Sequence, residues 1–294
     1  MEDSLKPALY VVATPIGNLE DITLRALRIL KSADYIAAED TRHSRILLDH
    51  YGIQSRLFSL HDHNERNRRV AISEFILSGK SVALISDAGT PLISDPGYHV
   101  AAYCREQGIL VIPVPGPSAV ISALSASGLP TDRFFFGGFL PVKSKALREE
   151  LEHLRLVTAT SVYYESPRRI LDTLAAVAEV LGSDRRVVLG RELTKTFESF
   201  YDLPAGEMIA FLREDPCRQK GEFVLMIAGA TESKDDIPQE VLSAFRIMLT
   251  RLPLNAASAL CAEIFNVKKN ELYRRGLEFA RDAEDHEPAT ESEN

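Results

Sequence analysis

Five polar loops hold most of the residues in this chain that could carry chemistry. Each loop directly follows a short apolar run, and together they are rich in carboxylates, histidines, glycines and prolines. A structural scaffold alone does not require so many such residues where apolar runs end. Carboxylates and histidines in this number suit general acid–base chemistry and the recognition of hydroxyl and amine groups. The loops are residues 14–19, 39–44, 61–65, 86–97 and 115–118.

The loop at residues 86–97 is the most informative of the five. Asp87 and Asp95 supply acceptors for hydroxyl or amine groups, while Gly89 and Gly97 allow a ligand to approach the backbone closely. Turn formation and helix capping explain each of these residues equally well when it is taken alone. No Gly-x-Gly-x-x-Gly follows the first apolar run and no Gly-Lys-Ser/Thr occurs, which removes the best support for a dinucleotide or a nucleoside triphosphate.

The elements that must position these loops alternate regularly. Five strand-like runs are separated by four helical stretches, which favours an α/β fold with a parallel sheet and helices on both faces. The carboxyl ends of parallel strands share one edge, where ligands bind, so the five loops are predicted to form one site. The predicted strands are 9–13, 35–38, 57–60, 82–86 and 110–114, and the helices lie near 22–32, 44–51, 64–78 and 98–107.

The pattern changes after Pro117. A helix of small residues is predicted at 118–127, followed by a second α/β unit with more antiparallel character. Its strands are expected at 134–139, 161–164, 187–189, 197–201 and 223–227, and its helices near 144–155, 168–181 and 206–213. Three helical stretches at 238–281 resemble a helix-turn-helix around Asn266-Val267, although any small helical bundle explains them equally. The expected domains are 1–117, 118–231 and 232–281, followed by a disordered acidic tail at 282–294.

The charge distribution leaves a nucleic-acid substrate open. The formal net charge is −8, but six acidic residues follow Arg281, so the rest of the chain carries −2. Phosphate contacts would therefore have to come from a local basic patch. No apolar run approaches the roughly 20 residues of a membrane-spanning helix, and the first seven residues do not form a signal peptide. These features predict a cytoplasmic protein that does not enter the membrane.

No residue set favours a metal site. Cys104, Cys217 and Cys261 are far apart and are predicted to be small buried residues rather than nucleophiles. His61 and His63 alternate on what reads as an extended run, so they are expected to face opposite ways.

Long motifs in both α/β units resemble one enzyme family, that of ribosomal RNA small subunit methyltransferase I. They begin with Thr14–Thr23 and Ala38–Arg42 and continue to about residue 230. The helices at 238–281 match the family's C-terminal extension in less detail. The other matching motifs are residues 61–65, 86–97, 115–117, 138–141, 164–169, 191–195 and 220–222.

The resemblance implies a fold, a cofactor and a reaction. The family belongs to the tetrapyrrole methylase superfamily, in which two α/β domains enclose a cofactor cleft. It implies S-adenosylmethionine as cofactor, the 2'-hydroxyl of a decoding-centre cytidine in 16S rRNA of the small ribosomal subunit as acceptor, and a homodimer. The superfamily's acidic Gly-Asp-Pro stands here as Gly89-Thr90-Pro91, which argues against a tetrapyrrole substrate.

The cofactor contacts expected on this basis come from both units. Asp87 would accept from the ribose or the ammonium, amides near Gly89 and Thr90 would bind the carboxylate, and Tyr164 would form the second wall. The remaining expected cofactor residues are Pro15, Gly17, Leu92, Ile93, Ser118 and Ala119.

Methyl transfer to a ribose hydroxyl also requires a proton acceptor and residues that bind the RNA. Glu39 or Asp40 is the favoured acceptor, beside Arg42 as a phosphate contact, while His61 and Glu65 are further acid–base candidates. A purely structural ion pair between Asp40 and Arg42 is a nearly equal alternative. The expected substrate contacts are Arg42, His61, Glu65, Arg168 and Lys195.

Two other functions compete with this one. The first is a methyltransferase that acts on a precorrin-like small molecule. The second is a nucleic-acid-binding protein without enzymatic activity, in which the C-terminal helices do the work and the α/β units are scaffold.

Overall fold

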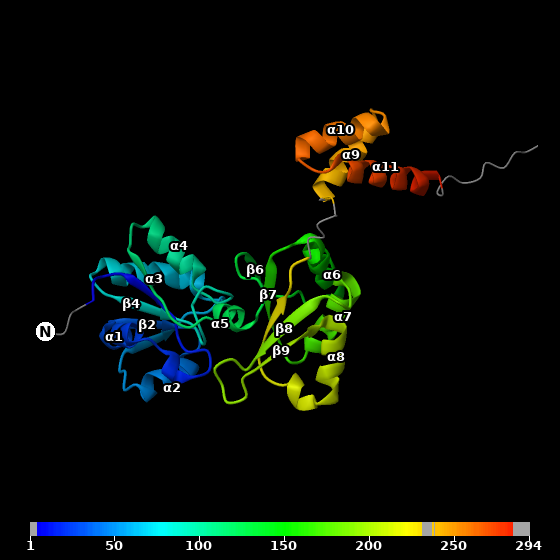
Figure 1. Cartoon of the computed structure of the whole chain (residues 1–294). Coiled ribbons are helices and arrows are strands. Elements are labelled where there is room, and N and C mark those ends of the chain that lie inside the picture. Colours follow the sequence, from blue (N-terminus) through cyan, green and yellow to red (C-terminus); the bar gives the residue numbers. More distant parts are fainter. Residues whose placement is uncertain (1–4, 231–236, 238, 285–294) are drawn as a thin grey trace, which may run out of the picture. The chain divides into compact units, whose positions relative to one another are not determined.

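The computed structural model describes residues 5–230, 237 and 239–284 (Figure 1). The chain divides into two compact units, Met1–Ala230 and Thr231–Asn294. The first unit contains two five-stranded sheets, and the second contains helices. Within the first unit, we call the first sheet with its helices and loops the first domain, and the second sheet with its helices and loops the second domain.

The first sheet is entirely parallel, as predicted, with the strand order β3-β2-β4-β1-β5. Its strands are only four residues long, and alternate side chains face opposite sides, so Leu9 and Tyr10 enter different cores. Because all five strands are parallel, the polar loops that follow them meet at one edge. The strands are β1 (Leu9–Val12), β2 (Tyr35–Ala38), β3 (Arg56–Ser59), β4 (Val82–Ile85) and β5 (Val111–Val114).

Helices cover both faces of this sheet. The helices α1 (Leu24–Ser32) and α2 (Thr41–His50) pack on one face through residues such as Ile29 and Leu48. The helices α3 (Glu65–Leu77) and α4 (Tyr98–Glu106) pack on the other. A short 3-10 helix, η1 (Leu19–Asp21), precedes α1. The helix α2 begins three residues before the predicted position because the Asp40 side chain caps its first turn.

The second sheet is mixed, in the order β6-β7-β10-β8-β9. Only β6 and β7 are parallel, and the other three pairings are antiparallel, which confirms the predicted change in character. The strands are β6 (Phe134–Phe139), β7 (Thr160–Glu165), β8 (Arg186–Arg191), β9 (Ser199–Pro204) and β10 (Phe223–Ile227).

The helix α5 (Ala119–Ala126) packs on one face of the second sheet, where Ala123 and Leu124 join Val162, Val188 and Val224. The opposite face carries the other helices and the larger of the two cores. These helices are α6 (Ser144–His153), α7 (Ile170–Leu181) and α8 (Ala205–Glu214), with the 3-10 turns η2 (Leu154–Leu156) and η3 (Pro216–Gln219).

The C-terminal unit has a core of its own, with Phe245, Ala257 and Leu272 buried. Asn266, in the left-handed conformation at φ 53°, ends α10 and makes the predicted turn. Residues 282–284, expected in a disordered tail, extend α11, and the rest of that tail lies outside the described residues. The three helices are α9 (Gln239–Leu249), α10 (Leu254–Phe265) and α11 (Lys269–Glu284).

The three cysteines were all expected to be buried. Cys104 and Cys261 are buried, and burial raises the pKa of both thiols, so neither is a reactive thiolate. The prediction was wrong for Cys217, which is exposed because it lies on the surface turn η3.

Within the described ranges, no helix combines the length and the apolar character needed to cross a bilayer.

Candidate functional site

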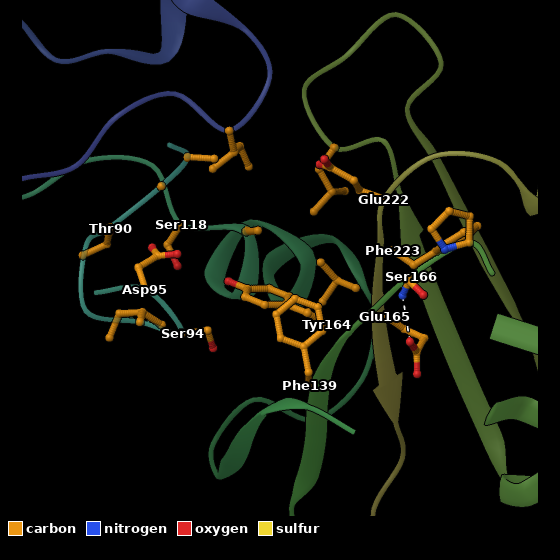
Figure 2. A pocket seen from close by; sticks show the side chains of 18 residues that line it. Thr90, Ser94, Asp95, Ser118, Phe139, Tyr164, Glu165, Ser166, Glu222 and Phe223 are labelled. Carbon is orange, nitrogen blue, oxygen red and sulfur yellow. Dashed lines mark hydrogen bonds between the residues drawn. The ribbon is translucent and has the colours of Figure 1, made fainter. Parts of the chain in front are cut away.

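A cavity of about 340 Å³ opens beside the carboxyl edge of the first sheet, and residues from both sheets' domains line it (Figure 2). The loops after β1, β4 and β5 form one side. The strands β6, β7 and β10 and the loop after β8 form the other. This is the edge at which an open α/β sheet binds its ligands.

Six of the ten residues expected to contact a cofactor line this cavity. They come from three segments that are far apart in the sequence, namely the loop after β4, the start of α5 and the strand β7. They are Gly89, Thr90, Ile93, Ser118, Ala119 and Tyr164.

The other four expected residues lie beside the cavity rather than on its lining. Asp87 joins the loops that follow β2 and β4. Its Oδ1 accepts a hydrogen bond from the Asp40 amide at 3.1 Å, and its own amide donates to Glu39. Leu92 turns into the core beneath the loop, where it packs against Gly97. Pro15 and Gly17 flank Ile16, which does reach the cavity.

Asp95 is the acidic side chain that the first domain presents to the cavity (Figure 2). The pKa of Asp95 is raised to about 6, chiefly by burial and also by the neighbouring carboxylates of Glu39, Asp87 and Asp62, while a hydrogen bond with Ser86 acts in the opposite direction. The sequence led us to expect Asp87 as the acidic cofactor contact, whereas it is Asp95 that lines the cavity.

The loop that carries Asp95 is held in an unusual shape. Leu92 and Ser94 have positive φ values of 74° and 68°, a region that side chains rarely adopt. The end of the loop is fixed by Glu65, whose Oε1 accepts from the amides of Gly97, His99 and Val100 at 2.6 to 3.2 Å. Glu65 is 4% exposed. These contacts give Glu65 a structural function, so we do not retain it among the proposed substrate contacts.

The second domain supplies an apolar wall that sequence reasoning largely missed. Tyr164 accepts a hydrogen bond from the Val120 amide at the start of α5, and burial together with Asp95 raises its pKa to about 12. The ring of Phe139 meets Tyr164 edge-on, with the centroids 5.6 Å apart. Nothing in a buried strand pattern indicates which side chains border a cavity. Taking both sides of the cavity together, the lining residues that were not among the expected cofactor contacts are Ile16, Ala88, Ser94, Asp95, Phe139, Glu165, Ser166, Pro167, Leu193, Glu222, Phe223 and Val224.

The loops after β1 and β8 contact each other next to the cavity residues Ile16 and Leu193. The amide of Asn18 donates to Thr194 Oγ1 at 3.1 Å, and a Cβ at Gly17 would stand 2.5 Å from Lys195 Cγ. Lys195 Nζ donates to both Glu192 and Glu222 at 3.0 Å. In this structure Lys195 therefore stabilises a loop of the cavity wall, and its charge is already paired.

The favoured catalytic residues differ in their surroundings. Arg42 makes a double hydrogen bond to Asp40 and holds the pKa of that carboxyl well below its usual range. The pKa of Glu39 is raised, chiefly by burial and also by Asp87 and Asp62. Of the two carboxylates, that of Glu39 therefore accepts a proton more readily.

The histidines form a turn instead of a strand. The rings of His61 and His63 are 5.9 Å apart, so the expectation that they face opposite ways was wrong. The Asn64 side chain contacts both the His61 ring and the His61 amide. Among the described residues no group of three or more potential ligands could hold a metal ion.

Comparisons with known proteins assign the family. Residues 8–209 match the family model described as Tetrapyrrole (Corrin/Porphyrin) Methylases. The chain belongs to this family. Residues 235–280 match the model described as RsmI C-terminal HTH domain.

Similar proteins agree with this assignment. The chain is 51% identical to "Ribosomal RNA small subunit methyltransferase I" of Escherichia coli O157:H7 over 94% of its own length and 96% of the relative's. It is 53% identical to the protein of the same name from Vibrio cholerae over 92% and 95%.

Solved structures show the fold alone. Diphthine synthase matches with a TM-score of 0.60 at 16% identity, covering 76% of this chain and 90% of that one. Uroporphyrin-III-C-methyltransferase from Thermus thermophilus matches with a TM-score of 0.53 at 21% identity, covering 75% and 93%.

Proposed function

We propose that the chain uses S-adenosylmethionine to methylate the 2'-hydroxyl of a cytidine in the decoding centre of 16S rRNA. The observation that carries this proposal is the two-sided cavity in a chain about half identical, over nearly its whole length, to named small-subunit rRNA methyltransferases. Methyltransferase activity follows from the family, and the cytidine and its ribose oxygen are the finer part of the proposal.

The residues around the cavity fit this cofactor. The molecule combines cationic groups, a carboxylate, a ribose diol and an apolar, planar adenine. Asp95 suits the cation or the hydroxyls. The amides at the start of α5, apart from the Val120 amide that binds Tyr164, have no side-chain cap and suit an anionic or carbonyl oxygen. Tyr164, Leu193 and Val224 suit the adenine. The cofactor carries no phosphate, so the missing phosphate-binding loop is no obstacle.

Bound S-adenosylmethionine supplies a methyl group on a positively charged sulfur. The protein must then align the ribose oxygen and accept its proton, since alignment alone contributes several kcal/mol, on the order of 7 in favourable cases. Glu39 is the proposed proton acceptor because its carboxylate has the raised pKa and belongs to the carboxylate group around Asp95. Arg42, whose side chain is 90% exposed, is the proposed phosphate contact.

The RNA is larger than this cavity and needs further contacts. On α11 the exposed side chains of Lys269, Tyr273 and Arg274 offer two cations and an aromatic ring. We assign RNA docking to the C-terminal unit, which contains α11. In the first unit, His61 and Arg168 remain candidate RNA contacts. The active form is proposed to be a homodimer.

Transfer of tritium from labelled S-adenosylmethionine to small ribosomal subunits tests the proposal. Digestion of the product to nucleosides should yield labelled 2'-O-methylcytidine. Label on the cytosine base, on another nucleoside, or on protein would contradict it, and so would the absence of label with both assembled subunits and free 16S rRNA.

A further inference from the structure

The strand β6 ends in a bulge that places an exposed aromatic ring at the mouth of the cavity. The parallel pairing of β6 with β7 slips between Phe136 and Phe139, at Gly137 and Gly138. Bulges next to active sites commonly redirect a side chain. Here the redirected side chain is Phe139, which lines the cavity while remaining 59% exposed.

Two glycines make this arrangement possible. A Cβ at Gly137 would stand 2.2 Å from the Tyr163 ring, so only glycine fits there. Gly138 has φ +67°, and a Cβ on it would stand 3.2 Å from Ser94 Oγ, next to Asp95. The bulge therefore brings Phe139 close to the loop that carries Asp95.

Phe139 is supported on one side and free on the other. Its ring meets Tyr164 edge-on, as Figure 2 shows, and is still 59% exposed. The ring therefore offers an exposed apolar face directly beside the cavity.

The surroundings of this ring favour a polyanion. Arg168 follows the cavity residues Ser166 and Pro167, and Lys143 follows the end of β6 after a short loop. The two loops are tied together, because Arg169 donates to the carbonyls of Leu140 and Pro141 at 2.9 Å. Arg168 and Lys143 are both exposed, and within the described ranges neither side chain makes an ion pair or a hydrogen bond.

We propose that Phe139 is a stacking platform for an unpaired base of the RNA, and that Arg168 and Lys143 hold the adjoining phosphates. Aromatic side chains beside free cations are the general means by which proteins bind unstacked, single-stranded nucleotides. The proposal rests on the proposed function, since it assigns the substrate side of the same cavity. The exposed face of Phe139 is the substrate side, and Asp95, α5 and Tyr164 form the cofactor side.

Three substitutions at Phe139 separate stacking from apolar packing. Phe139→Ala should raise the KM for small ribosomal subunits about tenfold. Phe139→Leu should behave like Ala, because it keeps apolar bulk without a π face, whereas Phe139→Tyr should stay within about twofold of wild type. The affinity for S-adenosylmethionine, measured by calorimetry, should not change. The matched control is Phe134→Ala, which removes an exposed ring at the far end of the same strand.

Arg168→Gln should weaken subunit binding and reduce its dependence on salt, whereas Arg213→Gln, an exposed arginine on α8, should do neither. Direct binding of small subunits, measured without methyl transfer, keeps this test independent of the proposed reaction. The inference is overturned if Phe139→Ala binds subunits like wild type, or if it loses S-adenosylmethionine affinity to the same extent. A shift of the Phe139→Ala variant to a smaller oligomer would also overturn it, because the ring would then belong to a contact between copies.

Discussion

The two sides of the cavity are built in different ways. The first domain contributes loops at the ends of parallel strands, and these loops carry carboxylates, glycines and hydroxyls. The second domain contributes strand and loop residues that are mainly apolar or aromatic, among them Phe139, Tyr164 and Val224. One side therefore offers hydrogen bonds and charge, and the other offers shape and an apolar surface.

The polar side also shows that few of its carboxylates are free to react. Glu65 is held by three amides, Asp87 accepts from the Asp40 amide, and Asp40 is paired with Arg42. Asp95 faces the cavity and Glu39 has a raised pKa. We therefore propose that the chemistry of this edge depends on Asp95 and Glu39, while the other carboxylates fix the loops that present them.

The largest effect is expected when a structural carboxylate is removed. Glu65→Ala leaves three amides without their acceptor and should lower the free energy of unfolding by about 3 kcal/mol. It should also weaken S-adenosylmethionine binding, because the loop that carries Asp95 loses its anchor. Urea denaturation measures the first effect, with Glu74→Ala on the exposed face of the same helix as control. A decrease in the free energy of unfolding of less than about 1 kcal/mol would mean that the loop keeps its shape without the hydrogen bonds to Glu65.

If Glu39 reacts and Asp40 is structural, substitutions at these two residues should lower kcat by different amounts. Glu39→Gln should lower kcat about a hundredfold with cofactor affinity intact, as expected for loss of a general base. Asp40→Asn should lower kcat only severalfold, because Asp40 is a helix cap with a lowered pKa. Single-turnover kinetics measures both, and the reverse order of effects would assign the proton to Asp40.

Removing the C-terminal unit tests whether it serves docking. A chain ending at residue 230 retains every residue that lines the cavity. It should bind S-adenosylmethionine normally and bind small subunits about tenfold more weakly, since the cations of α11 are lost. Loss of cofactor binding in a truncated chain that still folds would instead make this unit part of the cofactor site.

A smaller effect is expected at Lys195. Lys195→Met breaks the contacts with Glu192 and Glu222 and should weaken S-adenosylmethionine binding about threefold by loosening the wall, within the range of partly exposed ion pairs. The salt dependence of RNA binding should remain that of the wild type, both in this variant and in the control Lys31→Met, which changes an exposed lysine. A reduced salt slope with normal cofactor affinity would make Lys195 a phosphate contact.

The sequence predicted the polar side of the cavity far better than the apolar side. Strand ends in a parallel sheet share an edge whatever their packing, so Gly89, Thr90 and Ser118 could be placed from pattern alone. Asp87 was expected in place of Asp95, which lines the cavity on a loop where Leu92 and Ser94 have positive φ values that no sequence pattern indicates.

The apolar side depends on packing in three dimensions. Phe139 reads as one more residue of an apolar strand, and only its bulge next to Ser94 shows that it borders a cavity. Glu65 shows the same limit, because its bonds to amides of α4 join segments more than thirty residues apart.

The ionised state of Asp95 tests the account most directly. Its pKa of about 6 means that the carboxylate predominates above this pH and is protonated below it. If the carboxylate binds the cofactor, affinity should be constant above about pH 7 and fall roughly tenfold for each pH unit below 6. Asp95→Asn should bind weakly at every pH and show no such transition.

Calorimetric titration of S-adenosylmethionine into wild type and Asp95→Asn, at about pH 5 and pH 7.5, gives the answer. The account predicts binding at a single site that weakens in acid for the wild type and is weak throughout for the variant. Full affinity in Asp95→Asn, or a wild-type affinity that does not change with pH, would contradict it.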